Sequence, residues 1–219
     1  MTFRRALVTG GRSGIGAAIV AALERDGADV EVLDLADGFD VADPEAWKSV
    51  GSVDLACLNA GVVTRETDVT RIEVEQYRRI LGANVDGVVF GTRRMAQVMA
   101  PGASIVATAS LAGLVAMPLD PIYTLTKHAV VGFVRAVAPQ LAQRGITINA
   151  LCPGFADTPI VEPDLREWVD GQGIPLIPAE TVAVAALTAA RSGETGQAWV
   201  VQPGREPLVY EFRGVPGPR

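Results

Sequence analysis

Residues 6–16 read Ala-Leu-Val-Thr-Gly-Gly-Arg-Ser-Gly-Ile-Gly, a short apolar run that leads into a glycine-rich turn. A helical pattern follows at once over residues 14–26, and Gly27 is its stop signal. A strand, a glycine-rich turn and a helix in this order let the backbone approach a pyrophosphate and point helix amides at it. We therefore expect a dinucleotide to contact this turn through Gly10, Arg12, Ser13, Gly14, Ile15 and Gly16.

Strand and helix patterns alternate along the rest of the chain. The expected strands are brief and apolar on both faces, over residues 6–9, 29–33, 55–59, 104–109, 147–151 and 198–201. The other long helices are expected over residues 74–91, 123–144 and 179–190. This alternation predicts a parallel sheet covered by helices on both sides. The fold class is thus a three-layer, doubly wound α/β Rossmann fold, in a single domain over residues 1–219.

Two regions depart from a regular alternation. Only Leu35 to Phe39 separate the second strand from the next polar cluster, whereas a full crossover needs about 10–12 residues. We expect the helix at this place to be missing. Pro139 predicts a kink or a local irregularity in its helix. Residues 205–219 carry three prolines and little periodicity, so we expect an extended C-terminal tail that could pack on a partner subunit.

The composition limits the function classes. The chain has 219 residues, of which 49% are hydrophobic, and a formal net charge of -6. This charge argues against a nucleic-acid partner or an anionic membrane surface. No run of about 18 apolar residues could span a bilayer, and two cysteines with one histidine make no metal-ligand set. We expect a cytoplasmic protein without a metal ion.

The second strand ends in Asp34, about twenty residues after the glycine turn. A carboxylate at this position can accept hydrogen bonds from the adenosine ribose hydroxyls and would repel a 2′-phosphate. Arg12 acts in the other direction, because a guanidinium near the turn could pair with a 2′-phosphate. Asp34 occupies the more decisive position, so the sequence predicts NAD rather than NADP.

A second cluster is formed by Ser110, Tyr123 and Lys127. Tyr123 and Lys127 are four residues apart at the start of a predicted helix, so their side chains share a face. A free phenol has a pKa of about 10, too high for a base at neutral pH, and a nearby ammonium together with the positive nicotinamide ring favours the phenolate. Ser110 could donate a hydrogen bond to a substrate oxygen. Of the 19 Lys and Arg residues only Lys48 and Lys127 are lysines, which suggests that an ammonium matters at position 127.

Other catalytic chemistries have little support. His128 is the only histidine, and it is rotated by roughly 100° from Lys127 around the helix, which leaves no partner for a Ser/His/Asp hydrolase. A zinc-dependent dehydrogenase would need a ligand set that the two distant cysteines do not supply.

These motifs resemble those of the short-chain dehydrogenase/reductase family, in its smaller single-domain branch. The resemblance runs from about Ala6 to Thr158 and returns weakly over residues 196–203. It implies that Tyr123 is the acid/base and that Lys127 lowers the pKa of Tyr123 and binds the nicotinamide ribose. It further implies that Ser110 orients the substrate and that Asn84 holds a water in a proton relay. The further cofactor contacts expected are Leu35, Asp40, Val41, Asn59, Ala60, Gly61, Tyr123, Lys127, Pro153, Gly154, Phe155 and Thr158.

Some positions depart from the family's pattern. Leu58 precedes Asn59 where a second asparagine is frequent, and the segment 158–178, where the family has a lid, is short and acidic. The usual C-terminal Asp-Gly-Gly is replaced by residues 202–204, Gln-Pro-Gly. The resemblance implies a homodimer or homotetramer formed through the helices that begin near residues 74 and 123.

The sequence therefore predicts an NAD-dependent oxidoreductase that interconverts a secondary alcohol and a ketone. One alternative is a carbonyl reductase that prefers NAD(P)H, and another is a non-catalytic dinucleotide sensor, which would be expected to lose the Ser/Tyr/Lys set. An epimerase or dehydratase would need a larger C-terminal domain. We expect a hydrophobic or cyclic small-molecule substrate, because apolar residues are expected to line its site: Leu111, Leu114, Val115, Met117, Leu119, Ile122, Phe155 and Trp168.

Overall fold

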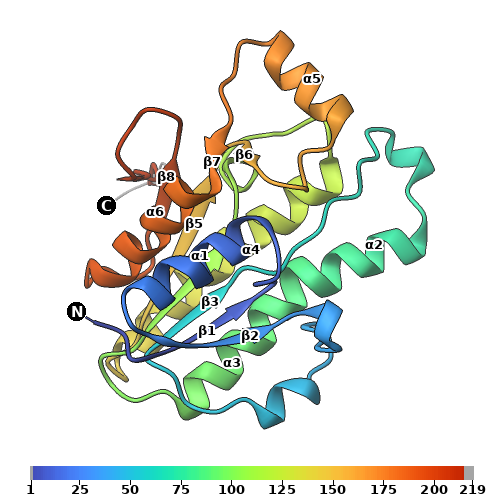
Figure 1. The fold of residues 1–219 in the computed structure, drawn as a ribbon. Helices are drawn as coiled ribbons and strands as arrows, with labels where there is room; N and C mark the ends of the chain where they lie inside the picture. Colours follow the sequence, from blue (N-terminus) through green and yellow to red (C-terminus); the bar gives the residue numbers. More distant parts are fainter. Residues whose placement is uncertain (1, 215–219) are drawn as a thin grey trace.

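The computed structural model describes residues 2–214 and contains a seven-stranded sheet flanked by helices (Figure 1). The strand order is β2-β1-β3-β4-β5-β8-β9, in which all neighbours are parallel except β8 and β9. The strands are β1 (Arg5–Thr9), β2 (Asp29–Leu33), β3 (Leu55–Leu58), β4 (Ser104–Thr108), β5 (Thr147–Pro153), β8 (Ala198–Val201) and β9 (Leu208–Val209). The predicted Rossmann fold is confirmed.

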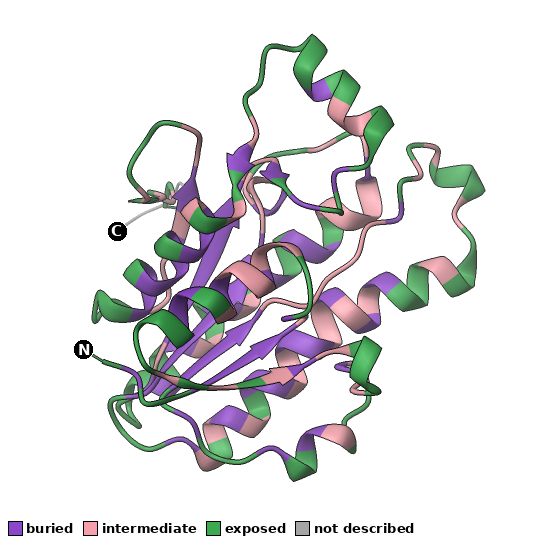
Figure 2. Ribbon diagram, in the orientation of Figure 1, coloured by how far each residue is buried: buried purple, intermediate pink, exposed green. Residues whose placement is uncertain are grey.

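Two apolar cores lie on opposite faces of the sheet, since successive side chains of a strand point to opposite faces. In β1, Leu7 belongs to one core, while Ala6 and Val8 belong to the other. Figure 2 shows the central strands buried and the outer helix surfaces exposed. The first core is covered by α3 (Gly87–Val98) and α4 (Pro121–Ala142), and the second by α1 (Gly14–Arg25) and α6 (Ala179–Arg191).

The helix predicted over residues 74–91 is not a regular α-helix throughout. It consists of α2 (Val74–Leu81), a five-residue π-helical turn over Gly82–Asp86, and α3. Single π turns inside α-helices are frequent at functional sites. Pro139 lies inside α4, which continues to Ala142, so the predicted irregularity does not end the helix there.

The connection between β2 and β3 contains no α-helix, as the short spacing predicts. Two 3-10 turns take its place, at Leu35–Asp37 and Ala46–Ser49. Trp47 fills the space under this connection: its indole Nε1 donates to the Val41 carbonyl at 2.9 Å, and its ring meets Phe39 edge to face. The shortened crossover is thus held by an aromatic pair.

After β5 the chain leaves the main sheet and returns to it. A small two-stranded sheet of β6 (Ala156–Asp157) and β7 (Ile177–Pro178) brackets α5 (Pro163–Gly171), a helix that the sequence analysis did not predict. No helix among residues 2–214 is long and apolar enough to cross a membrane.

The C-terminal segment packs on its own chain as far as the structure describes it. β9 pairs with β8, and Tyr210 and Phe212 pack against the first core. The Arg135 guanidinium of α4 lies 3.7 Å from the centre of the Phe212 ring. The last part of the expected tail, residues 215–219, lies outside the described residues.

Candidate active site

The expected site residues gather at the carboxyl ends of the parallel strands. The glycine turn follows β1, Asn59 follows β3, and Ser110 follows β4 by two residues. Tyr123 and Lys127 come from the first turns of α4, with the Lys127 Nζ 5.4 Å from the centre of the Tyr123 ring. The Ser110 hydroxyl lies close enough to Tyr123 to lower the pKa of the phenol, while it donates to the Pro153 carbonyl at 3.4 Å. The structure therefore brings the three predicted residues together at the edge where ligands of α/β sheets bind.

α4 begins where it does because of Asp120. This carboxylate caps the helix by accepting a hydrogen bond from the Tyr123 N–H, and Pro121 occupies the first helical position. The sequence analysis missed Asp120, although Asp-Pro at a helix start is a capping signal.

The same carboxylate holds a loop that is distant in the sequence. Asp120 is 7% exposed and accepts hydrogen bonds from the Thr64 N–H, the Thr64 hydroxyl and the Arg65 N–H, at 2.7, 2.6 and 2.9 Å. Including the Tyr123 N–H, four donors thus meet one buried carboxylate. No sequence pattern pointed to Thr64.

Lys127 is buried within the site. Its ammonium is 3% exposed and donates to the Thr108 carbonyl at the end of β4, at 2.7 Å. Burial lowers the pKa of Lys127 to about 8, because the charged form loses its hydration.

The pKa of Tyr123 differs from the expectation. Burial raises the pKa of Tyr123 to about 12, and the hydroxyl of Ser110 opposes this rise only in part. The negative charges of Asp120 and Cys152 raise it further. The expected lowering by Lys127 is therefore not found in the chain by itself, where loss of hydration of the phenolate is the largest influence.

Asn84 lies in the π-helical turn and is fully buried. Its Oδ1 accepts from the Val62 N–H at 2.8 Å, and its Nδ2 donates to the Val62 carbonyl and to the Thr126 hydroxyl at 2.9 and 3.0 Å. A Cβ added to Gly61 would lie 3.1 Å from the Asn84 Oδ1 and 3.5 Å from the Lys127 Nζ. Asn84, Gly61 and Lys127 are therefore neighbours, and Asn84 ties the chain after β3 to α4.

The glycine turn has the shape of a phosphate cradle. Gly10 and Gly14 have φ values of 65° and 51°, which favour glycine, and a Cβ on Gly16 would lie 2.0 Å from the Gly10 carbonyl oxygen. α1 starts at Gly14, and the side chain of its N-cap Ser13 makes no capping bond. The first amides of a helix have no partners within it, so they are available to an anion. These residues fit a dinucleotide pyrophosphate.

Hydrogen bonds fix the floor of this cradle. The Thr9 hydroxyl accepts from the N–H groups of Asn59 and Ala60 at 2.9 and 3.0 Å. The Asn59 amide also donates to the Thr9 carbonyl and accepts from the Thr108 hydroxyl. Asn59 thus joins the ends of β1, β3 and β4.

At the end of β2, two carboxylates meet Arg12. Asp34 accepts from the backbone N–H groups of Arg12 and Ala36, both at 3.0 Å. The Arg12 guanidinium binds Asp37, with distances of 2.7 Å from Nε and 3.1 Å from Nη2. The sequence analysis missed Asp37. The guanidinium that could have received a 2′-phosphate is engaged by a carboxylate of the same chain.

The other residues expected at the adenine end differ in exposure. Leu35 follows Asp34 and is 72% exposed, which suits a surface that an aromatic base could cover. Asp40 accepts from the Ala42 N–H at 2.9 Å, and the Val41 side chain is buried in the first core. Leu35 and Asp40 are thus accessible at this end, while Val41 mainly supports the core.

The segment after β5 lies against the glycine turn. A Cβ on Gly14 would lie 3.1 Å from the Thr158 Cβ, so the two positions are in contact. Phe155 packs edge to face on Trp168 of α5, with ring centres 6.3 Å apart, and Pro153 and Gly154 form the end of β5 and the residue after it. Segment 153–158 therefore lies beside the glycine turn.

The apolar residues expected on the substrate side all keep some exposure. Val115 and Trp168 are 53% and 41% exposed, which is unusual for large apolar side chains. The others are half-buried: Leu111, Leu114, Met117, Leu119, Ile122 and Phe155. Apolar surface beside Ser110 and Tyr123 is thus available to a ligand.

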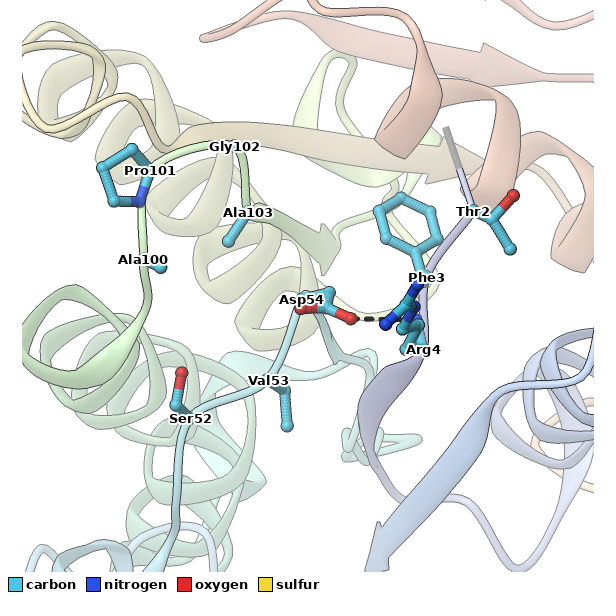
Figure 3. Close-up of a pocket in the computed structure, with 10 residues that line it drawn as sticks. All are labelled: Thr2, Phe3, Arg4, Ser52, Val53, Asp54, Ala100, Pro101, Gly102 and Ala103. Atoms are coloured by element: carbon cyan, nitrogen blue, oxygen red, sulfur yellow. Dashed lines mark hydrogen bonds between the residues drawn. The ribbon is translucent and has the colours of Figure 1, made fainter.

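A cavity of about 330 Å³ lies at the amino ends of the parallel strands, at the other end of the strands from the candidate site (Figure 3). Its walls come from residues 2–4, 52–54 and 100–103, just before the strands begin. The Asp54 carboxylate accepts from the N–H groups of Arg4 and Arg5 at 2.8 and 3.0 Å. Asp54 thus fixes the backbone here, and the cavity is remote from the Ser/Tyr/Lys cluster.

Comparisons with known proteins agree with this geometry. A family model described as enoyl-(acyl carrier protein) reductase, of the short-chain dehydrogenase/reductase type, matches residues 39–201. A 3beta-hydroxysteroid dehydrogenase of Mediterraneibacter gnavus is 36% identical over 156 residues, which cover 67% of this chain and 55% of that protein. The match thus spans about half the length of that relative.

Two further proteins are aligned with this chain over a larger share of their own length. A cyclohexanol dehydrogenase of Acinetobacter sp. is 30% identical over 186 residues, covering 71% of this chain and 74% of that protein. The crystal structure of a short-chain dehydrogenase from Burkholderia cenocepacia in complex with NADP superimposes with a TM-score of 0.80 at 27% identity. That alignment covers 92% of this chain and 97% of the other.

Proposed function

The chain belongs to the short-chain dehydrogenase/reductase family, and on this basis we propose that it interconverts a secondary alcohol and a ketone with NAD. The oxidoreductase class is supported by relatives that are dehydrogenases. The observation that carries the proposal is the cluster of Ser110, Tyr123 and Lys127 beside a glycine turn that fits a dinucleotide.

Tyr123 is the proposed acid/base. In the direction of oxidation its phenolate oxygen takes the hydroxyl proton of the alcohol, and in reduction the phenol returns a proton to the ketone oxygen. Ser110, which lies beside Tyr123, donates to the same substrate oxygen and holds it against the phenol. When bound, the nicotinamide supplies the hydride acceptor or donor.

Lys127 and Asn84 support the acid/base. The Lys127 ammonium stabilises the phenolate and binds the nicotinamide ribose from its place beside Tyr123. Its pKa of about 8 is close to neutral pH, which allows it to pass a proton onward. Asn84 is proposed to hold a water of this relay, as the resemblance implies, while its hydrogen bonds to Val62 and Thr126 fix its position.

The rest of the cofactor is proposed to contact the glycine turn, Asp34, and the segments after β3 and β5. NAD is preferred because Asp34 stands at the ribose end of β2 and Arg12 is engaged by Asp37. The Burkholderia structure holds NADP, so a carbonyl reductase that prefers NAD(P)H is the second candidate. We also propose that the chain is one domain and acts in the cytoplasm as a homodimer or homotetramer.

The proposed substrate is a hydrophobic secondary alcohol, preferably cyclic. The partly exposed apolar residues expected on the substrate side, such as Val115 on the segment after Ser110 and Trp168 against Phe155, support this class. The names of the steroid and cyclohexanol dehydrogenases also place the alcohol on a ring.

The test is a screen of cyclic and linear secondary alcohols and their ketones, with NAD(H) and with NADP(H) in turn. Turnover is measured by the absorbance of the reduced nicotinamide. We expect NAD-linked turnover that is highest with ring alcohols. If the chain bound NAD but turned over no member of a broad panel, the sensor alternative would replace the proposal. A higher kcat/KM with NADP would instead favour the reductase.

A further inference from the structure

Asp37 and Arg12 form a two-point ion pair at the adenosine end of the candidate cofactor site. Both carboxylate oxygens of Asp37 are used, one by the Arg12 Nε and one by its Nη2. This fork-to-fork geometry is the one with which arginine also binds a phosphate group. Asp37 therefore occupies the donors that would otherwise be offered to a phosphate.

The backbone around the pair is fixed by hydrogen bonds. Asp34 accepts from the N–H groups of Arg12 and Ala36, so it ties the glycine turn to the residue just before Asp37. The 3-10 turn then ends at Gly38, whose φ of 86° only glycine adopts readily. The position of Asp37 opposite Arg12 is thus set by the turn that follows β2.

We propose that Asp37 is a specificity-determining residue that excludes ligands with a 2′-phosphate. It does so by binding the Arg12 guanidinium and by adding a second negative charge next to Asp34. The inference rests on the proposed use of NAD. Two carboxylates, Asp34 and Asp37, would then discriminate against a 2′-phosphate, and Asp37 would do so by binding Arg12.

The pair is well suited to a substitution test. The Arg12 and Asp37 side chains are 60% and 42% exposed, and exposed ion pairs contribute little to folding stability. Asp37→Asn therefore keeps the fold and removes one charge. Asp43→Asn is the matched control, because Asp43 is an exposed carboxylate of the same connection that accepts from the Glu45 N–H and leaves the Arg12 pair intact.

The experiment compares adenosine 2′,5′-bisphosphate with AMP by isothermal titration calorimetry, without nicotinamide or turnover. In the wild type we expect the bisphosphate to bind more weakly than AMP. In Asp37→Asn the affinity for the bisphosphate relative to AMP should rise by about tenfold, as for one gained charge-assisted hydrogen bond. Adding Arg12→Gln should abolish the gain, and Asp43→Asn should not reproduce it.

Each contrary result has a separate meaning. If the wild type favours AMP and Asp37→Asn leaves the ratio unchanged, the role of Asp37 is overturned while the proposed use of NAD stands. An equal gain in Asp43→Asn would also overturn it, because general charge repulsion would then explain the discrimination. A wild type that favours the bisphosphate would overturn the proposed NAD preference and the role of Asp37 together.

Discussion

The Asp120 carboxylate accepts a hydrogen bond of 2.8 Å from the backbone N–H of Tyr123. Through its other bonds, the same carboxylate fixes the loop at Thr64 and Arg65 against the start of α4. The Arg65 guanidinium in turn pairs with Glu162, just before α5, at 2.6 Å. The proposed acid/base is thus connected to the loop after β3 and, through that loop, to the segment before α5.

Replacing Asp120 by Asn should damage both the fold and the site. An amide has one acceptor oxygen and presents an NH2 group to the N–H donors that now meet a carboxylate, so at least one buried donor loses its partner. We expect the free energy of unfolding to fall by about 2–3 kcal/mol, which urea titration would measure.

Substitutions at Thr64 test the bond between Asp120 and the loop while the Asp120 carboxylate that caps α4 remains in place. Thr64→Val removes the hydroxyl that donates to Asp120 and accepts from the Glu66 N–H, and should cost about 1 kcal/mol, whereas Thr64→Ser should retain these bonds and most of the stability. A stability loss in the serine variant with none in the valine variant would show that the methyl group, and not the hydroxyl, matters at this position.

Tyr123→Phe removes the proposed proton-transfer oxygen and leaves the ring. We expect kcat to fall by about 10²–10⁴-fold, while the affinity for NAD, measured by calorimetry, should fall far less, because the other expected cofactor contacts, including Lys127, remain. Tyr77→Phe is the matched control, since Tyr77 lies on α2 and is partly exposed. Full turnover in the Tyr123 variant would contradict the proposed mechanism.

The sequence was sufficient for features that depend on local order. The strand, glycine turn and helix of residues 6–26 are adjacent in the chain, and so are the four residues from Tyr123 to Lys127. The missing helix after Asp34 followed from the few residues, Leu35 to Phe39, that precede the next polar cluster. In each case neighbouring residues carry the whole signal.

Features that depend on distant partners were missed. Asp120 and Thr64 are 56 positions apart, and Arg12 and Asp37 are 25 apart, so only the fold brings each pair together. The sequence shows the ammonium near Tyr123 but not the depth of burial, which raises the pKa of Tyr123 in the chain by itself. The predicted lowering includes the charge of a bound nicotinamide ring and stays a prediction. α5 escaped prediction because its polar surface gives a weak apolar pattern.

Gly16→Ala tests the phosphate cradle. The new Cβ would lie 2.0 Å from the Gly10 carbonyl oxygen and 2.8 Å from the Asn59 Nδ2, and backbone at this distance cannot yield without moving the turn. We expect a lower melting temperature and loss of AMP binding by calorimetry. Gly171→Ala is the control, because a Cβ on this helical glycine meets nothing within 4 Å. It should raise stability by up to about 1 kcal/mol. Normal AMP binding by Gly16→Ala would show that the turn does not hold the phosphate.

Lys127 should make folding stability depend on pH. Its pKa is lowered by burial from 10.5 to about 8. Between these values the unfolded chain holds a proton that the folded chain has lost, so the free energy of unfolding rises with pH; below pH 8 both states are protonated and the slope vanishes. Lys127 by itself should add about 1 kcal/mol to the free energy of unfolding between pH 7.5 and 9. The buried thiols of Cys57 and Cys152, whose pKa values are raised from 9.0 to about 12, act in the opposite direction from about pH 8 upward and offset more than half of this gain, so the net rise of the wild type in urea titrations should be small.

The two lysines of the chain supply a matched pair for this measurement. Lys127→Met removes the buried ammonium, so the rise between pH 7.5 and 9 should disappear, and the variant should be at least as stable as the wild type at pH 7 because a buried charge is no longer desolvated. Lys48→Met should keep the rise, because the Lys48 ammonium is exposed and pairs with Glu45 at the surface. A rise that persists in Lys127→Met would assign the titration to another group and would remove the physical basis for Lys127 as a proton relay near neutral pH.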